Sequence, residues 1–279
     1  MPATWITLPT PPPVVCDQRP LDVVFLVDAS GSMKRPHGVE AGNSRLDSVR
    51  DTLVQVEQGL AARGDGSRSA LIVTSGNGVP ANNLANGARL VAGLGAGHAA
   101  VLAALQQLDD APIVDKASSP AAIALRKVLD VLIQQRDPSH RVVLVWATDN
   151  LGNIDLAGRG PRFYTDEELQ AVAIIDGAGG FFGPEKVLFQ GNFNPTIFTY
   201  DAQPVADAMV AASRLLETEP LRILSLVPRG DGTVEKPVLR EDLVLWAAAK
   251  SGGEVFGSSE RSGLISLAGP MLQAMSCTP

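Results

Sequence analysis

Hydrophobic residues along the chain occur in two patterns that alternate: continuous apolar runs, which are typical of buried strands, and a helical spacing. Several short segments are apolar almost throughout, with few polar positions inside them. Runs of this kind, apolar on both faces, are typical of parallel strands covered by helices on each side. The pattern predicts strands at residues 21–27, 70–74, 88–94 (a weaker, edge strand), 141–148, 221–227 and 254–256.

Between these segments the apolar residues recur at steps of three and four, which is the helical spacing. It is clearest from about Ser44, where the apolar positions are Leu46, Val49, Leu53, Val56 and Leu60. Further helices are predicted at residues 98–108, from 119 onward (serine as cap, proline at the first helical position), and at 205–217, 241–250 and 264–275. Strands alternating with helices predict an α/β fold with a doubly wound, mostly parallel central sheet.

Two segments depart from this alternation. Residues 150–203 contain glycines, scattered aromatic residues and one helix start, capped by Thr165 with Glu168 three residues on. We interpret them as an insertion in one domain that spans residues 21–279. Residues 1–20 form a proline-rich N-terminal segment, in which residues 9–13 have the composition of a stiff spacer.

The composition fits a chain with a large core and excludes two classes of partner. Of 279 residues, 45% are hydrophobic and 19% are charged, and the net charge is −7 with no run of Lys or Arg. That balance argues against binding to nucleic acid or to an anionic membrane surface. Because no apolar stretch reaches about eighteen residues, we also expect no membrane span in this chain.

Polar side chains with metal-binding chemistry follow two of the predicted strands. Asp28, Ser30 and Ser32 come directly after the first strand, and Asp149 ends the strand at 141–148. Ligands of open α/β sheets bind at the carboxyl ends of strands. If the two strands are neighbours, two carboxylates and several hydroxyls meet at one edge, together with the loop at 116–120. Hard oxygen donors with only two charges suit Mg²⁺, which would stay attractive to a further anionic oxygen.

This pattern resembles the metal-ion-dependent adhesion site (MIDAS) of von Willebrand factor A (vWA) domains. The aspartate-x-serine-x-serine element is met in full by Asp28, Ser30 and Ser32 within VVFLVDASGSM. The family's threonine aligns with Ser119 in SSPAAIALRKVL, where Ser118 is an alternative hydroxyl, and its last aspartate aligns with Asp149 in VLVWATDN. The segment LWAAAKSGGEVF is similar to the helix, double glycine and short strand that close many of these domains. The resemblance runs from residue 21 to about 275, apart from the insertion.

The resemblance implies a Rossmann-like fold and a binding role without catalysis. Mg²⁺, with Ca²⁺ or Mn²⁺ as alternatives, would be held by Asp28, Ser30, Ser32, Ser119 and Asp149. The ion would bridge to an Asp or Glu carboxylate of a protein partner in an adhesion module. An alternative role within the family is that of a cytosolic adaptor for a ring-shaped ATPase of the MoxR or chelatase type.

Three enzyme classes are disfavoured by the residues present. A haloacid-dehalogenase-type phosphatase needs an aspartate two residues after the first one, and this chain has Ser30 there. No Gly-Lys-Ser/Thr loop of a nucleotide enzyme occurs. A serine hydrolase needs a histidine, and none of His37, His98 and His140 lies in a triad motif; we expect all three at the surface.

The two cysteines bear on the cellular setting. Cys16 precedes the first strand and Cys277 lies three residues from the end, and the termini of open α/β domains are often close. We therefore predict a disulfide between them and an oxidising, extracellular or cell-surface setting. The alternative is two unrelated thiols in a cytoplasmic protein, which would favour the adaptor role.

Overall fold

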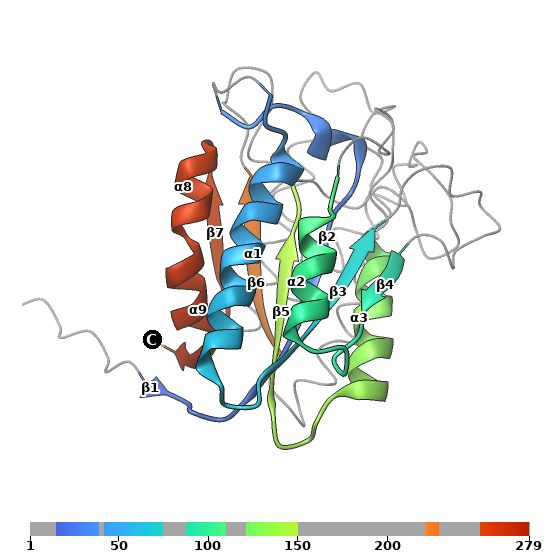
Figure 1. The fold of residues 1–279 in the computed structure, drawn as a ribbon, viewed down its shortest axis with the longest axis vertical. Coiled ribbons are helices and arrows are strands. Elements are labelled where there is room, and N and C mark those ends of the chain that lie inside the picture. Colours follow the sequence, from blue (N-terminus) through green and yellow to red (C-terminus); the bar gives the residue numbers. More distant parts are fainter. Residues whose placement is uncertain are drawn as a thin grey trace, which may run out of the picture.

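A six-stranded sheet forms the centre of the fold (Figure 1). The structure is a computed structural model, and it describes residues 15–38, 42–74, 88–109, 121–149, 221–228 and 252–278. The strand order is β4-β3-β2-β5-β6-β7. All neighbouring strands are parallel except β3 and β4, so the predicted mostly parallel α/β sheet is confirmed.

Each strand of this sheet lies where the apolar runs predict one. The bounds are Leu21–Val27 for β2, Arg68–Thr74 for β3, Ala88–Ala92 for β4, Arg141–Ala147 for β5, Arg222–Pro228 for β6 and Glu254–Ser258 for β7. β4 is an edge strand, as expected, and its partner β3 is bulged between Leu71 and Ile72.

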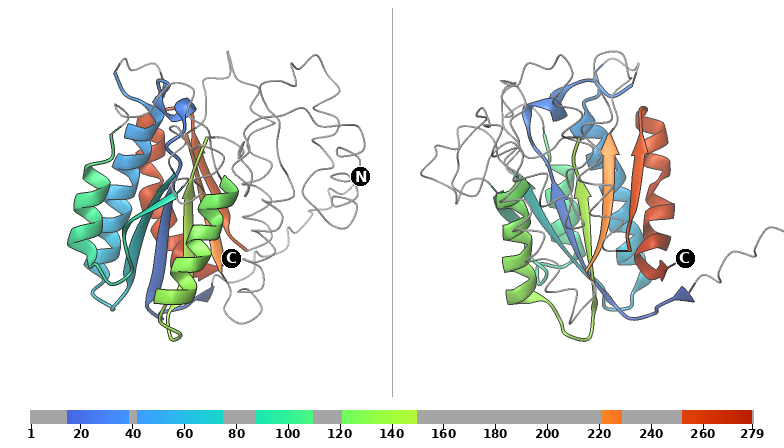
Figure 2. Two further views of the ribbon diagram at one scale, coloured as in Figure 1. Left: turned by 90° about the vertical axis from the view of Figure 1, so that its right-hand side faces the viewer. Right: turned by 180° about the vertical axis from the view of Figure 1, so that it is seen from behind.

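Helices cover both faces of the sheet (Figure 2). On one face lie α1 (Arg45–Arg63), α2 (His98–Gln106), α8 (Arg261–Ser266) and α9 (Ala268–Ser276), and on the other lies α3 (Ala121–Gln135). A short 3-10 helix, η1 (Gly31–Lys34), follows β2. None of the helices among the described residues is long and apolar enough to cross a membrane.

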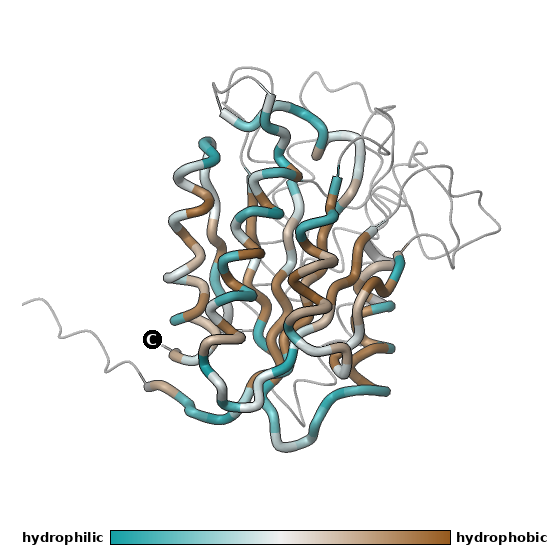
Figure 3. Tube along the Cα trace, viewed as in Figure 1, coloured by the Kyte–Doolittle hydropathy of each residue, from teal (hydrophilic) through white to brown (hydrophobic). Residues whose placement is uncertain are grey.

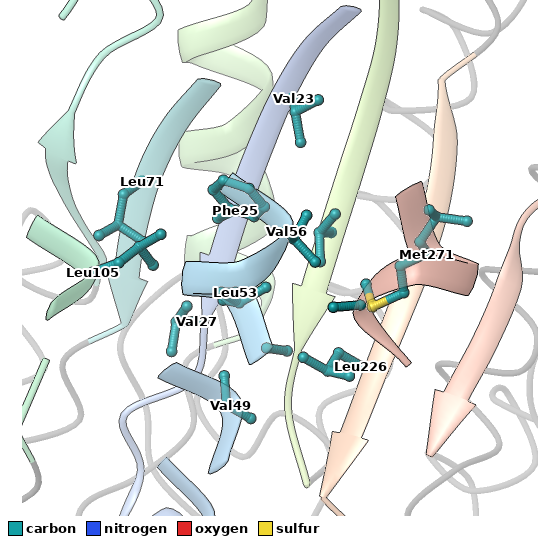
Figure 4. Close-up of a cluster of buried hydrophobic side chains, with 14 of the residues drawn as sticks. Val23, Phe25, Val27, Val49, Leu53, Val56, Leu71, Leu105, Leu226 and Met271 are labelled. Atoms are coloured by element: carbon teal, nitrogen blue, oxygen red, sulfur yellow. The ribbon is translucent and has the colours of Figure 1, made fainter. Parts of the chain in front are cut away.

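Side chains of β2 and α1 belong to the same hydrophobic core. All seven residues of β2 are buried, and alternate side chains of a strand point to opposite faces. The set that includes Phe25 meets the buried side chains of α1, among them Leu53 (Figure 4). Along the chain trace, hydrophobic positions are concentrated in the strands of the sheet, and hydrophilic positions are frequent in the turns at its two ends (Figure 3). This packing fixes the end of β2, from which the candidate site begins.

The two ends of the domain are joined covalently. β1 (Val15–Cys16) pairs antiparallel with β8 (Cys277–Thr278), and a disulfide links Cys16 to Cys277 across this pair. Arg141 and Arg222 donate hydrogen bonds to the carbonyl oxygens of Ser276 and Cys277. The predicted disulfide is confirmed, and it is supported by two buried or half-buried arginines from the central strands.

The prediction of one continuous last helix was wrong. The chain forms two helices, α8 and α9, with a turn at Leu267 between them. Pro270 explains the break, because proline has no N–H to donate to the carbonyl of Ser266 and its ring clashes with that group. It is tolerated in the first turn of α9, where no intrahelical donor is needed. The predicted insertion and the helices predicted at 205–217 and 241–250 lie outside the described residues.

Candidate metal centre

The candidate site lies at the carboxyl ends of β2 and β5, which are adjacent parallel strands. Asp28 follows β2, and its backbone N–H donates to the carbonyl of Ala147 at 2.8 Å. Directly after β5, the N–H of Thr148 donates to the carbonyl of Leu226 on β6 at 3.1 Å. The strand ladder thus continues past the strand ends, so that Asp28 and Asp149 are both held at the same edge of the sheet.

The carboxylate of Asp28 is buried and oriented by three donors. Its Oδ1 accepts from the backbone N–H of Ser30 at 2.9 Å and from the hydroxyl of Thr74 at 3.2 Å. Its Oδ2 accepts from the hydroxyl of Thr148 at 2.8 Å. These three bonds, to both oxygens of the carboxylate, fix its orientation at the edge of the sheet.

A row of oxygen atoms connects the two aspartate loops. The hydroxyl oxygens of Ser30 and Ser32 are 3.1 Å apart, and the Ser32 hydroxyl donates to Oδ1 of Asp149 at 2.7 Å. In an octahedral Mg²⁺ shell with metal–oxygen distances of about 2.1 Å, adjacent ligands are about 3 Å apart. The Ser30, Ser32 and Asp149 oxygens therefore already have the spacing of neighbouring ligands around one small cation.

Four of the five predicted metal ligands are brought together by the fold. Asp28, Ser30, Ser32 and Asp149 form one connected cluster through the bonds described above. The turn that presents the serines is fixed by η1, where the N–H of Met33 donates to the carbonyl of Ser30, and by the fully buried side chain of Met33. Ser119 and its alternative Ser118 lie outside the described residues.

A cation of the protein itself contacts this cluster. Arg45, the first residue of α1, donates from Nη1 to Oδ2 of Asp149, and both side chains are buried. Its backbone is fixed by a capping box in which the Ser44 side chain accepts from the N–H of Asp47 and the Asp47 carboxylate accepts from the N–H of Ser44. Asp149 thus divides its two oxygens between a guanidinium and the serine hydroxyls.

The donor set fits a hard divalent cation. Every side-chain atom of the oxygen row is a carboxylate or hydroxyl oxygen, as Mg²⁺ prefers. Among the described residues no group of three or more His, Cys, Asp or Glu side chains gathers as a metal site would. Within the described part of the chain, the oxygen donors that lie beside Asp28 and Asp149 are the hydroxyls of Ser30 and Ser32.

The expectation that the histidines lie at the surface was wrong for two of them. His37 and His140 are buried, and Nδ1 of His140 donates to Oδ1 of Asp22 at 2.9 Å, at the opposite end of β2. His98, which is partly exposed, contacts the Glu57 carboxylate through Nδ1. Each buried ring has at least one polar partner in the fold, Ser258 for His37 and Asp22 for His140, and hydrophobic spacing does not reveal such contacts.

Three residues of the site were missed in the sequence analysis. Thr148 precedes Asp149 directly, so its position at a strand end was a usable signal. Thr74 ends β3, but nothing in its local sequence shows that β3 lies beside β2. Arg45 carries a weak signal, because a basic residue at the start of a helix opposes the helix dipole and so needs another partner.

Comparison with known proteins relates this chain to a family of domains. Residues 23–152 match the family model of the von Willebrand factor type A domain. The matched segment begins within β2 and contains the Asp28 loop, β5 and Asp149, and the mostly parallel sheet with flanking helices is consistent with the fold of that family. These findings support a vWA domain in this part of the chain. A comparison with curated proteins found no match.

Several solved structures share the fold. The PilB minor pilin from Streptococcus sanguinis is 16% identical, with a TM-score of 0.56, over 94% of this chain and 62% of that one. The open conformation of the pilus adhesin SpaC from Lactobacillus rhamnosus GG is 16% identical, with a TM-score of 0.53, over 91% of this chain and 30% of that one. Proximal thread matrix protein 1 from the mussel byssus is 12% identical, with a TM-score of 0.52, over 94% of this chain and 49% of that one. This chain spans less than two thirds of each of these proteins.

Proposed function

We propose that the chain is a metal-dependent protein-binding module of the adhesion type. Mg²⁺, or Mn²⁺ or Ca²⁺ in its place, would be held by Asp28, Ser30, Ser32, Ser119 and Asp149. A partner would supply an Asp or Glu carboxylate to an open coordination position. The observation that carries the proposal is the row of Ser30, Ser32 and Asp149 oxygens at ligand-to-ligand spacing, beside the oriented carboxylate of Asp28.

The residues of the site have separable tasks in this proposal. When bound, the ion would supply a concentrated positive charge for an anionic group. The serine hydroxyls contribute neutral oxygens, which position the ion without cancelling its charge. Asp28 supplies a carboxylate with a full negative charge, and hydrogen bonds from Thr74 and Thr148 fix its orientation. Since binding requires no bond to be made or broken, we propose no catalytic role.

An extracellular or cell-surface setting is part of the proposal. Its support is the disulfide between Cys16 and Cys277, because such bonds persist in oxidising compartments. The shared fold with a minor pilin and a pilus adhesin is compatible with adhesion. The adaptor role beside a MoxR or chelatase ATPase would be favoured by unpaired cysteines, and the disulfide therefore speaks for the adhesion role.

The metal assignment is tested by calorimetric titration of Mg²⁺ into the wild type and two matched variants. Asp28→Asn keeps the size of the side chain but removes its charge at the site. Asp137→Asn makes the same change at the other end of the sheet, where the carboxylate bonds Ser139. We expect Mg²⁺ binding to be lost in D28N and kept in D137N. Equal Mg²⁺ affinity in all three proteins would refute the assignment.

The carboxylate-binding step is tested with Mn²⁺ as the probe ion. Bound Mn²⁺ relaxes water protons through the water molecules in its shell, so an added carboxylate that replaces one of them reduces this enhancement. We expect acetate to reduce the enhancement for wild-type protein with Mn²⁺, while chloride at the same ionic strength has no such effect. An enhancement that acetate leaves unchanged would contradict an open coordination position.

A further inference from the structure

We infer that Arg45 is a positioning residue that weakens cation binding at the candidate metal centre and so leaves the bound ion more attractive to an anionic ligand. The inference rests on the proposed function and concerns a residue that lies outside the predicted ligand set. It starts from the ion pair between Arg45 Nη1 and Asp149 Oδ2.

Arg45 occupies a place that is unfavourable for a positive charge. It is the first residue of α1, where the helix dipole presents its positive end, and its side chain is only 4% exposed. Burying a guanidinium in such a place costs free energy unless a carboxylate offsets it, and Asp149, with a side chain 2% exposed, lies in contact. A buried ion pair is weak evidence for stability, so its presence at this site points to a role in the site itself.

The pairing divides the Asp149 carboxylate. Oδ2 faces Arg45, while Oδ1 faces the hydroxyl of Ser32 in the row of oxygens. Arg45 thereby keeps one oxygen of Asp149 from turning toward a cation and restricts this residue to a single ligand atom. The rigid start of α1, fixed by the Ser44–Asp47 capping box, keeps the guanidinium in that place.

The positive charge of Arg45 also changes the net charge of the site. Asp28 and Asp149 together carry two negative charges, which would roughly neutralise a divalent ion. Because Arg45 returns one positive charge to the cluster, the site with its ion carries a net positive charge of about one. Cation affinity falls for this reason, and attraction for a carboxylate of a partner rises.

The test compares the wild type with Arg45→Gln and Arg45→Lys. Gln keeps a polar side chain without the charge, and Lys keeps the charge. By Coulomb interaction over a few ångströms in a partly buried site, we expect R45Q to bind Mg²⁺ about tenfold tighter or more in calorimetric titration. R45K should stay close to the wild type. For acetate binding to the Mn²⁺-loaded proteins, R45Q should be weaker than the wild type.

The sign of the change separates this role from a merely structural one. If Arg45 only supported the loops, R45Q would loosen the site and bind Mg²⁺ more weakly, which would overturn the inference, as would unchanged affinity. Should R45Q be unfolded by circular dichroism, saturating Mg²⁺ is expected to restore the fold by neutralising Asp149, and failure to do so overturns the inference. If neither the wild type nor R45Q binds Mg²⁺, the proposed function itself fails, together with this inference.

Discussion

His37 is a buried residue whose charge state the fold restricts. It lies between η1 and α1, and its Nε2 lies 2.9 Å from the carbonyl of Ser258, a contact in which the ring nitrogen donates. Among the described residues, its Nδ1 is buried with no hydrogen-bond partner. Burial lowers the pKa of His37 below 6.5; the bond to Ser258 and the charge of Glu260 act against this, and the positive charge of Arg45 adds to it.

This lowered pKa predicts a loss of stability in acid. Between the pKa of folded His37 and 6.5, the unfolded chain binds a proton that the folded chain does not, so stability falls as the pH decreases through this range and is kept above it. We expect His37→Gln, whose amide can donate to Ser258, to reduce the difference in free energy of unfolding between pH 7.5 and pH 5.5. Urea denaturation of both proteins at the two pH values measures this difference in free energy of unfolding. An equal pH dependence in both proteins would contradict the account.

At the level of single residues, a local motif in the sequence was enough to predict which side chains lie together at the edge of the sheet. Asp28, Ser30, Ser32 and Asp149 follow strand ends that hydrophobic runs mark, and the fold brings them together. Residues that act through contacts between distant segments could not be predicted in the same way. The approach of Arg45 to Asp149 depends on how α1 packs on the sheet, which no local pattern encodes.

Among the secondary-structure elements, β6 and β7 come unusually close at Gly253. A Cβ atom at this position would lie 1.8 Å from the carbonyl oxygen of Ile223 on β6, which is a backbone atom and cannot move aside cheaply. The glycine before β7 therefore permits the parallel pairing of β7 with β6, which begins at Glu254 opposite Leu224. The packing of α8 against β7 depends on that pairing.

We expect Gly253→Ala to destabilise the fold by about 3 kcal/mol, as overpacking against a fixed backbone does. Gly95→Ala is the matched control, because a Cβ there meets nothing within 4 Å. Its effect should be within about 0.5 kcal/mol of zero. Chemical denaturation of both variants measures the difference. A small effect of G253A would show that β7 can shift away from β6 without loss.

At the level of elements, hydrophobic spacing predicted the strands and α1 closely, because burial imposes their period. It gave the last helix wrongly as one element, since Leu264, Met271 and Met275 keep a helical spacing across the break at Leu267. The proline at 270 was the local signal that outweighed this spacing. The two-residue strands β1 and β8 were not predicted, because their pairing joins opposite ends of the chain.

For the whole molecule, the disulfide closes nearly the entire domain into one loop. Cys16 and Cys277 are separated by 261 residues, and the bond joins β1 to β8 beside α9. By the loop-closure model, a cross-link over a loop of this length stabilises the folded state by about 5 kcal/mol, chiefly by restricting the unfolded chain. The bond thus contributes to the stability of the whole fold rather than to the local site.

Removing this bond should lower the stability of the whole domain. We expect the double variant Cys16→Ser with Cys277→Ser to lose up to about 5 kcal/mol in free energy of unfolding. Wild-type protein denatured without reductant should show no titratable thiol. Two free thiols under those conditions would contradict the disulfide and would favour the cytosolic adaptor role.

The central claim is that oxygens from separate loops share one divalent cation. The most direct measurement is anomalous diffraction from crystals grown with Mn²⁺. The account predicts one strong peak about 2 Å from the hydroxyl oxygens of Ser30 and Ser32, in the cluster that contains Asp28 and Asp149. A peak at another place, or no peak at this cluster in crystals that hold Mn²⁺ elsewhere, would contradict it.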